Sequence, residues 1–209
     1  MNTFSIDKSS FINDFLSPIS KINEKCIINF EDNKASAIVT ENTSAIFLFC
    51  ESNIGFHGEK VSLNVGDVMK LQKALGCIEE DTPSFSLNQN NLQYKSKTLK
   101  FKYHLLEDGV IKTPPFNRDK LTNIPFTTEF KINKKEYSDV LKNSVFTSDS
   151  NKIYFYTKNK AVYCELNDKT IPNIDCIDMK VSESFEGSII SVPFALRLDW
   201  LRYFNGINF

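Results

Sequence analysis

The sequence lacks the features that would assign it directly to a metal-binding, nucleotide-binding or membrane class. None of its five cysteines forms a C-x-x-C pair, so it offers neither a zinc site nor a dithiol redox pair. It has no glycine-rich phosphate loop, and its longest apolar run, residues 45–50, is far too short to cross a bilayer. With only seven glycines and seven prolines in 209 residues, it is not a low-complexity chain either.

The cysteines and the N-terminus together predict a reducing compartment. Cys26, Cys50, Cys77, Cys164 and Cys176 are odd in number and scattered, which is typical of small buried thiols rather than of disulfides. The first eight residues, Met-Asn-Thr-Phe-Ser-Ile-Asp-Lys, lack the apolar core of a signal peptide. We therefore expect a location in a cytoplasm.

The chain also lacks an excess of positive or negative charge. The chain has 25 basic and 26 acidic residues and a formal net charge of −1, so it is not a generally basic nucleic-acid binder. Its hydrophobic content of 41% supports a core, and eighteen phenylalanines against one tryptophan make that core rich in phenylalanine. The length suggests one large domain or two modest ones.

No catalytic constellation is recognisable, and no cofactor or metal is predicted. The two histidines, His57 and His104, have no nucleophile or metal ligand near them in sequence. The carboxylates between Asp175 and Glu186 could hold Mg²⁺, but such a charge density in a strand-and-turn segment is typical of a solvated loop. An enzyme is therefore the least favoured class.

A repeat with a fixed spacing is the strongest pattern in the chain, since each matched pair differs by the same amount (130 − 4 = 126). The matches are Phe4, Ile6 and Lys8 with Phe130, Ile132 and Lys134, Ile27 with Ile153, and Asn-Lys-Ala at 33–35 with 159–161. Softer matches are Phe11 with Tyr137, Phe15 with Leu141, Ile19 with Val145, and Phe30 with Tyr156. The alternative is coincidence in a chain rich in lysine, asparagine and phenylalanine. The repeat predicts two copies of one structural unit.

The first copy predicts two helices and six short strands. One helix is capped by Asp7, buries Phe11, Phe15 and Ile19, and ends or bends near Ser17 because of Pro18. A second helix begins at Asn64 and buries Val68, Leu71 and Leu75. The expected strands are 26–30, 35–40, 45–51, the region of Phe85, 92–94 and 99–103, the first two forming a hairpin.

The second copy is shorter. Asn133 is predicted to cap a helix with Tyr137, Val140 and Leu141 on one face, followed by a hairpin of 152–157 and 161–166. A strand at 188–191 and a fourth helix with Pro193 in its first turn complete the copy. The resulting domains are 1–106 and 128–209, joined by an extended crossing segment, 107–127. We expect the second domain to lack its last strands.

The predicted helices share a basic face opposite their apolar residues. Ordinary amphipathic helices with solvated lysines would look the same, but the feature recurs on all four helices in an acidic chain. Such a face attracts phosphate without reading bases. The candidate DNA-facing residues are Lys8, Lys21, Lys70, Lys73, Lys134, Lys135, Lys142, Arg197 and Arg202.

On these residues the chain resembles the sliding clamps of myovirus-type tailed phages, the processivity factors of their DNA polymerases. The resemblance rests on Phe-Ser-Ile-Asp-Lys at 4–8, the hairpin around 33–35, the prolines at 114–115 and 125, and the restart at 130–134. It implies an α+β fold of two repeated clamp-type domains, with antiparallel sheets outside and two helices per domain lining one face.

The resemblance also implies function. It implies a homotrimeric ring around duplex DNA that is not an enzyme, tethers a DNA polymerase, is opened by a clamp loader and can serve late-transcription proteins in a bacterial host cytoplasm. Partner tails are expected beside the crossing segment, near Pro114, Phe116, Ile124 and Phe126. The alternatives are a β-rich two-domain phage structural or interaction protein without DNA function, and a monomeric subunit that holds DNA by charge alone.

Overall fold

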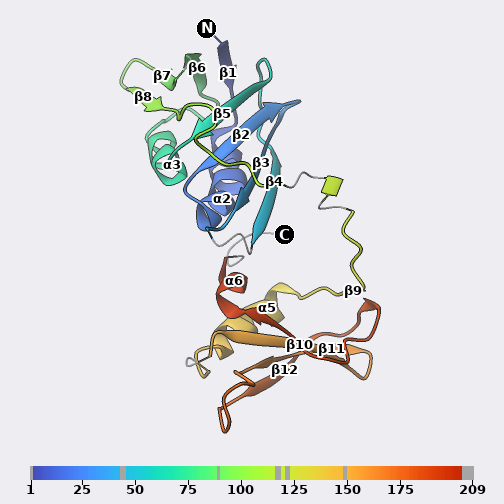
Figure 1. The fold of residues 1–209 in the computed structure, drawn as a ribbon. Coiled ribbons are helices and arrows are strands. Elements are labelled where there is room, and N and C mark those ends of the chain that lie inside the picture. The colour runs from blue at the N-terminus through green and yellow to red at the C-terminus, as the bar shows by residue number, and fades with distance from the viewer. Residues whose placement is uncertain are drawn as a thin grey trace. The chain divides into compact units, whose positions relative to one another are not determined.

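The computed structural model describes residues 2–42, 46–88, 90–115, 119–120, 123–147 and 150–203. Over these residues the chain is α+β, with antiparallel sheets and few helices, as the sequence predicts (Figure 1). It divides into two compact units, Met1–Asn123 and Ile124–Phe209. No helix in the described ranges is both long and apolar enough to span a membrane.

The first unit opens with a continuous helical segment of three parts, α1 (Lys8–Ser10), the π-helix η1 (Phe11–Leu16) and α2 (Ser17–Ile22). The carboxylate of Asp7 caps it by accepting from the Ser10 amide at 2.7 Å. Of the two outcomes predicted near Ser17, an end or a bend, the end is wrong, because the helix runs on through Pro18 and changes there from a π-helix to an α-helix. The wide π turn lies directly before the proline, where an α-helical carbonyl would meet the ring.

A four-stranded antiparallel sheet packs against this segment. Its strands β2 (Cys26–Glu31), β3 (Lys34–Thr40), β4 (Phe47–Asn53) and β5 (Val61–Val65) have the order β4-β3-β2-β5. Apolar residues alternate along β2 and β3, so one face of each strand enters the core. The buried helix residues Phe11 and Phe15 confirm the predicted inner face of the first helix.

The second helix of this unit, α3 (Val68–Gly76), begins four residues later than predicted. Asn64 belongs to β5, where it pairs with Ile27. The helix starts after Asp67, whose carboxylate accepts from the Lys70 amide at 2.8 Å. The predicted inner face is confirmed, since Val68, Leu71 and Leu75 are fully buried.

A second four-stranded sheet completes the first unit and contains the last three predicted strands. Its strands β1 (Asn2–Ser5), β6 (Ser84–Asn88), β7 (Asn91–Lys95) and β8 (Lys100–His104) have the order β1-β6-β7-β8. Phe4 joins the two sheets, because its ring lies 5.5 Å from that of Phe30 and 5.7 Å from that of Phe85. This aromatic cluster forms the centre of the core.

The second unit repeats the first sheet and its two helices. After β9 (Thr128–Glu129) come α5 (Lys134–Asn143), β10 (Lys152–Lys158), β11 (Ala161–Leu166), β12 (Ile177–Ser182), β13 (Glu186–Gly187), β14 (Phe194–Arg197) and α6 (Leu198–Arg202). The larger sheet has the order β12-β11-β10-β14, which matches β4-β3-β2-β5 position by position. The short strands β9 and β13 form a separate two-stranded sheet.

Three predictions for this unit are wrong. Residues 188–191 form no strand, and Phe194 lies in β14, paired with Phe155, rather than in a helix after Pro193. Pairing with β10 outweighs the local helix-start signal, so α6 begins only at Leu198. Tyr137 and Leu141, predicted to be buried, are half-buried, and Val140 carries the inner face of α5.

The internal repeat is present, but its register changes along the chain. The spacing of 126 fits the helix starts at Lys8 and Lys134. In the hairpins that follow, the buried residues of the two copies correspond at a spacing of 127. Cys26 in the first copy therefore corresponds to Ile153 in the second (153 − 26 = 127). The pairing of Ile27 with Ile153 is therefore wrong, because a one-residue slip moves a side chain to the other face of the sheet.

Candidate nucleic-acid and partner interfaces

Five of the nine predicted DNA-facing residues are exposed lysines on helices. Lys70 and Lys73 lie on α3, and Lys134, Lys135 and Lys142 lie on α5. None of the five forms an ion pair with another described residue. Lys134 and Lys135 occupy the first turn of α5, where positive charge opposes the helix dipole. These lysines are free to attract phosphate groups.

The two predicted lysines of the first helical segment have other surroundings. The ammonium group of Lys8 is half-buried and donates to the carbonyl of Ile78 at 2.7 Å, so it fastens the segment to the end of α3. Lys21 lies on α2 and is partly exposed. Lys8 is thus engaged inside its own unit and is the weakest DNA-facing candidate of the set.

The two predicted arginines share one carboxylate. Arg197 lies at the end of β14 instead of on a helix, and Arg202 lies on α6. Their guanidinium groups approach Asp199 at 3.2 and 3.1 Å. Although burial acts to raise it, the pKa of Asp199 lies below its usual value, because Asn151 and Arg197 donate hydrogen bonds and Arg202 adds a nearby positive charge. The shared carboxylate reduces the net charge at this end of the unit.

A groove of about 330 Å³ in the first unit includes one of the four predicted partner-pocket residues, Pro114. The segment 110–114 forms one wall, and the ends of β2 and β3, with Ile27 and Ile38, form the other. Ile27 and Ile38 face away from the core, so the floor of the groove is apolar.

The described lining of this groove does not include the other three predicted pocket residues. Phe116 lies outside the described residues. Ile124 and Phe126 belong to the second unit, where their side chains are 42% and 66% exposed. The predicted pocket around all four residues stays a prediction.

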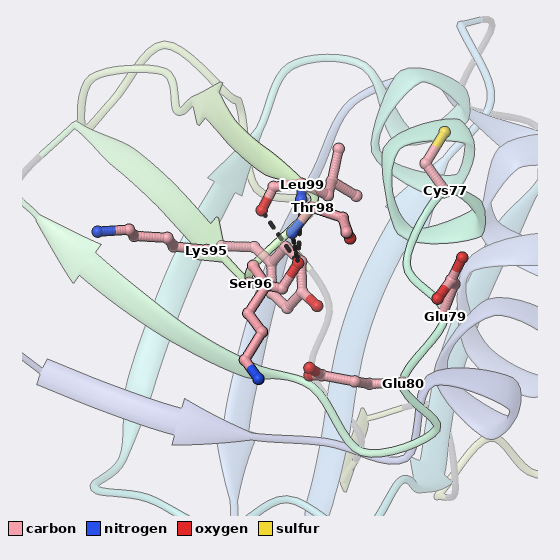
Figure 2. A pocket seen from close by; sticks show the side chains of 9 residues that line it. Cys77, Glu79, Glu80, Lys95, Ser96, Thr98 and Leu99 are labelled. Carbon is pink, nitrogen blue, oxygen red and sulfur yellow. Dashed lines mark hydrogen bonds between the residues drawn. The ribbon is translucent and has the colours of Figure 1, made fainter.

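A cavity of about 810 Å³ lies beside the turn between β7 and β8 (Figure 2). Figure 2 shows Glu79 and Glu80 in the chain after α3, with Lys95 at the end of β7 and Ser96 in the turn that follows it. The hydroxyl of Ser96 accepts from the Leu99 amide at 3.0 Å, which holds the turn closed. The lining mixes both signs of charge, and sequence reasoning did not identify it.

Two sheet edges form a further feature that the sequence analysis missed. No strand in the described ranges pairs with the outer edge of β8 or of β12. The β8 edge and the turn before it are basic, with Lys97, Lys100 and Lys102. The β12 edge carries charge of both signs, with Asp178 and Lys180 on the strand and Glu183, which pairs with Lys180, after it. The lysine spacing in 95–102 is a signal that could have indicated such an edge.

The described parts of the chain offer no metal site, and three of their thiols are buried. No group of three histidine, cysteine or carboxylate side chains there could hold a metal ion. Burial raises the pKa of the Cys26 and Cys164 thiols to about 12 and that of Cys50 to about 11. These three thiols therefore stay protonated, and unreactive as nucleophiles, at neutral pH.

No protein-family model matches the sequence, and no curated protein is similar to it. Solved structures do match. The chain is similar to PCNA of A. fulgidus, bound to the C-terminal region of FEN-1, with a TM-score of 0.74 and 12% identity over 98% of this chain and 82% of that one. It is similar to PCNA of Thermococcus kodakaraensis with a TM-score of 0.71 and 11% identity over 97% and 84%.

The bacterial DNA polymerase III beta subunit of Thermotoga maritima matches with a TM-score of 0.69 and 14% identity over 97% of this chain. The chain spans only 56% of that subunit's length. At such identities the likeness concerns the fold alone. Because the matched structures are sliding clamps and the likeness covers nearly all of the chain, the protein has the sliding-clamp fold.

Proposed function

We propose that this chain is the subunit of a phage-type sliding clamp, which encircles duplex DNA and tethers the replicative DNA polymerase. The observation that carries the proposal is the group of five exposed lysines without ion pairs on α3 and α5, on a sliding-clamp fold. A ring retains DNA by its topology, so dispersed phosphate contacts suffice and leave the ring free to slide. In this role the protein is a scaffold and not an enzyme.

The unpaired edges of β8 and β12 support a ring of several copies, which we propose to be a homotrimer. An unpaired edge strand presents a row of backbone donors and acceptors that a second chain can extend. The basic edge of β8 in one subunit pairs with the β12 edge of the next, where Asp178 provides a negative charge. Repeating this head-to-tail contact closes a ring if the rotation per subunit allows it.

The groove beside 110–114 supports docking of partner tails. Its lining includes Ile27 and Ile38, and it is bordered by an extended segment, as peptide-binding grooves commonly are. A neighbour with the same fold, PCNA of A. fulgidus, is bound to the C-terminal region of FEN-1. The partners we propose are the DNA polymerase, a clamp loader and late-transcription proteins, in the cytoplasm of a bacterial host.

Retention on DNA of different topology tests the proposal. Purified protein at high concentration is mixed with linear duplex whose ends are free, and the ends are then blocked with biotin and streptavidin. A ring that threads over an end stays on the blocked duplex when the salt concentration is raised, and leaves when a restriction enzyme opens the duplex.

Each alternative gives a different result. A monomer that holds DNA by charge leaves the blocked duplex as salt rises, since each phosphate contact is lost with released counterions. A structural or interaction protein never associates with DNA. Solution mass, measured in the same buffer, distinguishes the proposed trimer from a monomer.

A further inference from the structure

The second unit departs from the first at one corner of its fold, where the first helix and the connection after the hairpin meet. In the first unit the helix runs to Ile22, and Ile19 is fully buried. In the second unit α5 ends at Asn143, and the next residues form tight turns with bonds such as Phe146 N to Asn143 O at 3.1 Å. Val145, the counterpart of Ile19, is 75% exposed.

The connection after the hairpin is also longer in the second unit. Ten residues, 167–176, separate Leu166 from its partner Ile177, whereas eight, 40–47, separate the matching pair Val39 and Leu48. The register change from 126 to 127 falls between the helix and β10, which border the same corner. Both departures from the repeat therefore meet at one place.

At this corner the second unit has a cavity of about 260 Å³, and the first unit has a hydrogen bond beside its groove. In the first unit Asn23 donates from its side chain to the carbonyl of Thr40 at 2.8 Å. In the second unit the cavity is lined by Phe146, Thr147, Ser150, Ile171, Ile174 and Asp175, among others.

The lining of this corner cavity is unusual for a surface that faces only water. Phe146 is 62% exposed and Ile171 is 47% exposed, and neighbouring exposed apolar side chains of this size mark interaction sites. Among the described residues, the corner cavity thus leaves apolar side chains uncovered.

The charge and the volume of the corner cavity define which chemical group can bind there. Asp175 has no hydrogen bond or ion pair with any described residue, so one carboxylate at the cavity lacks a counter-charge. A volume of about 260 Å³ lies below the ~300–1,000 Å³ of small-molecule sites and fits a single large side chain. A segment with one large apolar side chain followed by a basic residue fits both the volume of the cavity and the charge of Asp175.

The chain itself provides an example of such a segment. In the first unit the groove at the matching corner is bordered by residues 110–114, whose sequence is Val-Ile-Lys-Thr-Pro. An apolar pair followed by Lys112 thus already lies beside the end of the helix and the start of the β3–β4 connection. The second unit has no such cover among the described residues.

We propose that the corner cavity of the second unit is a docking site for an extended segment of a partner protein, which inserts one large apolar side chain and pairs a following lysine or arginine with Asp175. This site is distinct from the groove beside 110–114. The inference does not depend on whether the chain encircles DNA.

The test uses the full-length protein, labelled with ¹³C at isoleucine methyl groups, and an acetylated peptide of residues 109–115. We expect saturable shifts of the Ile171 and Ile174 methyl signals in the millimolar range. A peptide with Ile111→Ser should not bind, and Lys112→Glu should weaken binding about two- to fivefold, the worth of one exposed ion pair. In the variant Asp175→Lys the preference between the lysine and glutamate peptides should reverse.

Phe146→Ser should abolish the shifts, and Ile189→Ser, which changes another exposed apolar side chain elsewhere in the unit, should not. Three outcomes would overturn the proposal. Shifts that never saturate, or that centre on residues 23–42, show that the cavity is not the site. Signals of Ile171 that depend on protein concentration show that a second copy covers it. Signals that change when residues 204–209 are deleted show that the chain covers it with its own end.

Discussion

The ammonium group of Lys8 donates a hydrogen bond of 2.7 Å to the carbonyl of Ile78, and the backbone amide of Lys8 donates to Asp81 at 2.9 Å. These two bonds join the first helical segment to the chain that follows α3, seventy residues away. The repeat counterpart of Lys8 is Lys134, which is exposed. One position of the repeat therefore has a structural role in the first unit that it lacks in the second.

Replacing Lys8 with methionine should lower the free energy of unfolding by about 1 kcal/mol, because a charged hydrogen bond is lost from a partly exposed site. Lys134→Met is the matched control and should change the free energy by less than about 0.5 kcal/mol, as exposed substitutions do. Urea unfolding followed by circular dichroism measures both. Equal effects of the two substitutions would contradict the structural role of Lys8.

Phe15→Ala should cost about 3–5 kcal/mol, the range for truncating a buried aromatic side chain. Phe15 is fully buried, and its ring stacks on Phe11 at 5.6 Å. Phe126→Ala makes the same chemical change at a side chain that is 66% exposed and should leave stability nearly unchanged. A loss below 1 kcal/mol at Phe15 would show that the helix does not depend on this face for its packing.

Much of this fold follows from local sequence patterns, and the errors have a common cause. The alternation in 26–40 and 152–166 identifies the hairpins, and the spacing of Val68, Leu71 and Leu75 identifies the inner face of α3. The errors occur where pairing with a residue distant in sequence determines the local structure. Phe194 lies in a strand because it pairs with Phe155, although Pro193 is a local signal for a helix start.

The register error shows the same limit. Matching Asn-Lys-Ala at 33–35 with 159–161 aligns turn residues, but Asn33 is the second residue of its turn and Asn159 is the first. Only the strand pairing reveals which face of the sheet is buried. The same holds for the site, since helical spacing selects the basic residues but not the contact that engages Lys8.

The ion pair between Lys152 and Asp168 makes a prediction about pH. The hydrogen bond from Lys152, followed by two from Thr170, lowers the pKa of Asp168 from 3.8 to about 2. A carboxylate whose folded pKa is depressed adds stability above its unfolded pKa and loses it as the pH falls toward the folded value. The stability difference between the protein and Asp168→Asn should therefore shrink between about pH 5 and pH 2.

Thermal melts at several pH values measure this difference. Glu183→Gln, which also removes an ion-paired carboxylate but at an exposed site, provides the comparison. A difference for Asp168→Asn that stays constant over the whole range would mean that ionisation of Asp168 does not contribute to stability.

The exposed lysines of α5 should act collectively on DNA. Single replacements of Lys134, Lys135 or Lys142 should change DNA retention little, because the contacts are dispersed. Changing all three to glutamate should abolish retention on end-blocked duplex without unfolding the protein, because favourable phosphate contacts become repulsive. The matched control changes the same charge at exposed lysines outside the helices that form no ion pair with a described residue, namely Lys131, Lys158 and Lys160. Equal losses for both triple variants would indicate that only net charge matters.

The groove beside 110–114 should bind the C-terminal peptide of the polymerase. Ile38→Asp places a charge on the apolar floor of the groove and should weaken binding about tenfold or more, since burying an unpaired carboxylate is costly. Ile189→Asp makes the same change at an exposed site of the second unit and should leave the affinity unchanged. Fluorescence anisotropy of the labelled peptide gives both affinities, and retention on end-blocked DNA shows that each variant is still folded. If peptide binding instead perturbs residues far from 23–27, 38–42 and 110–115, the groove is not the partner site. The proposal of a clamp would still stand, because it rests on the fold and on the basic helices.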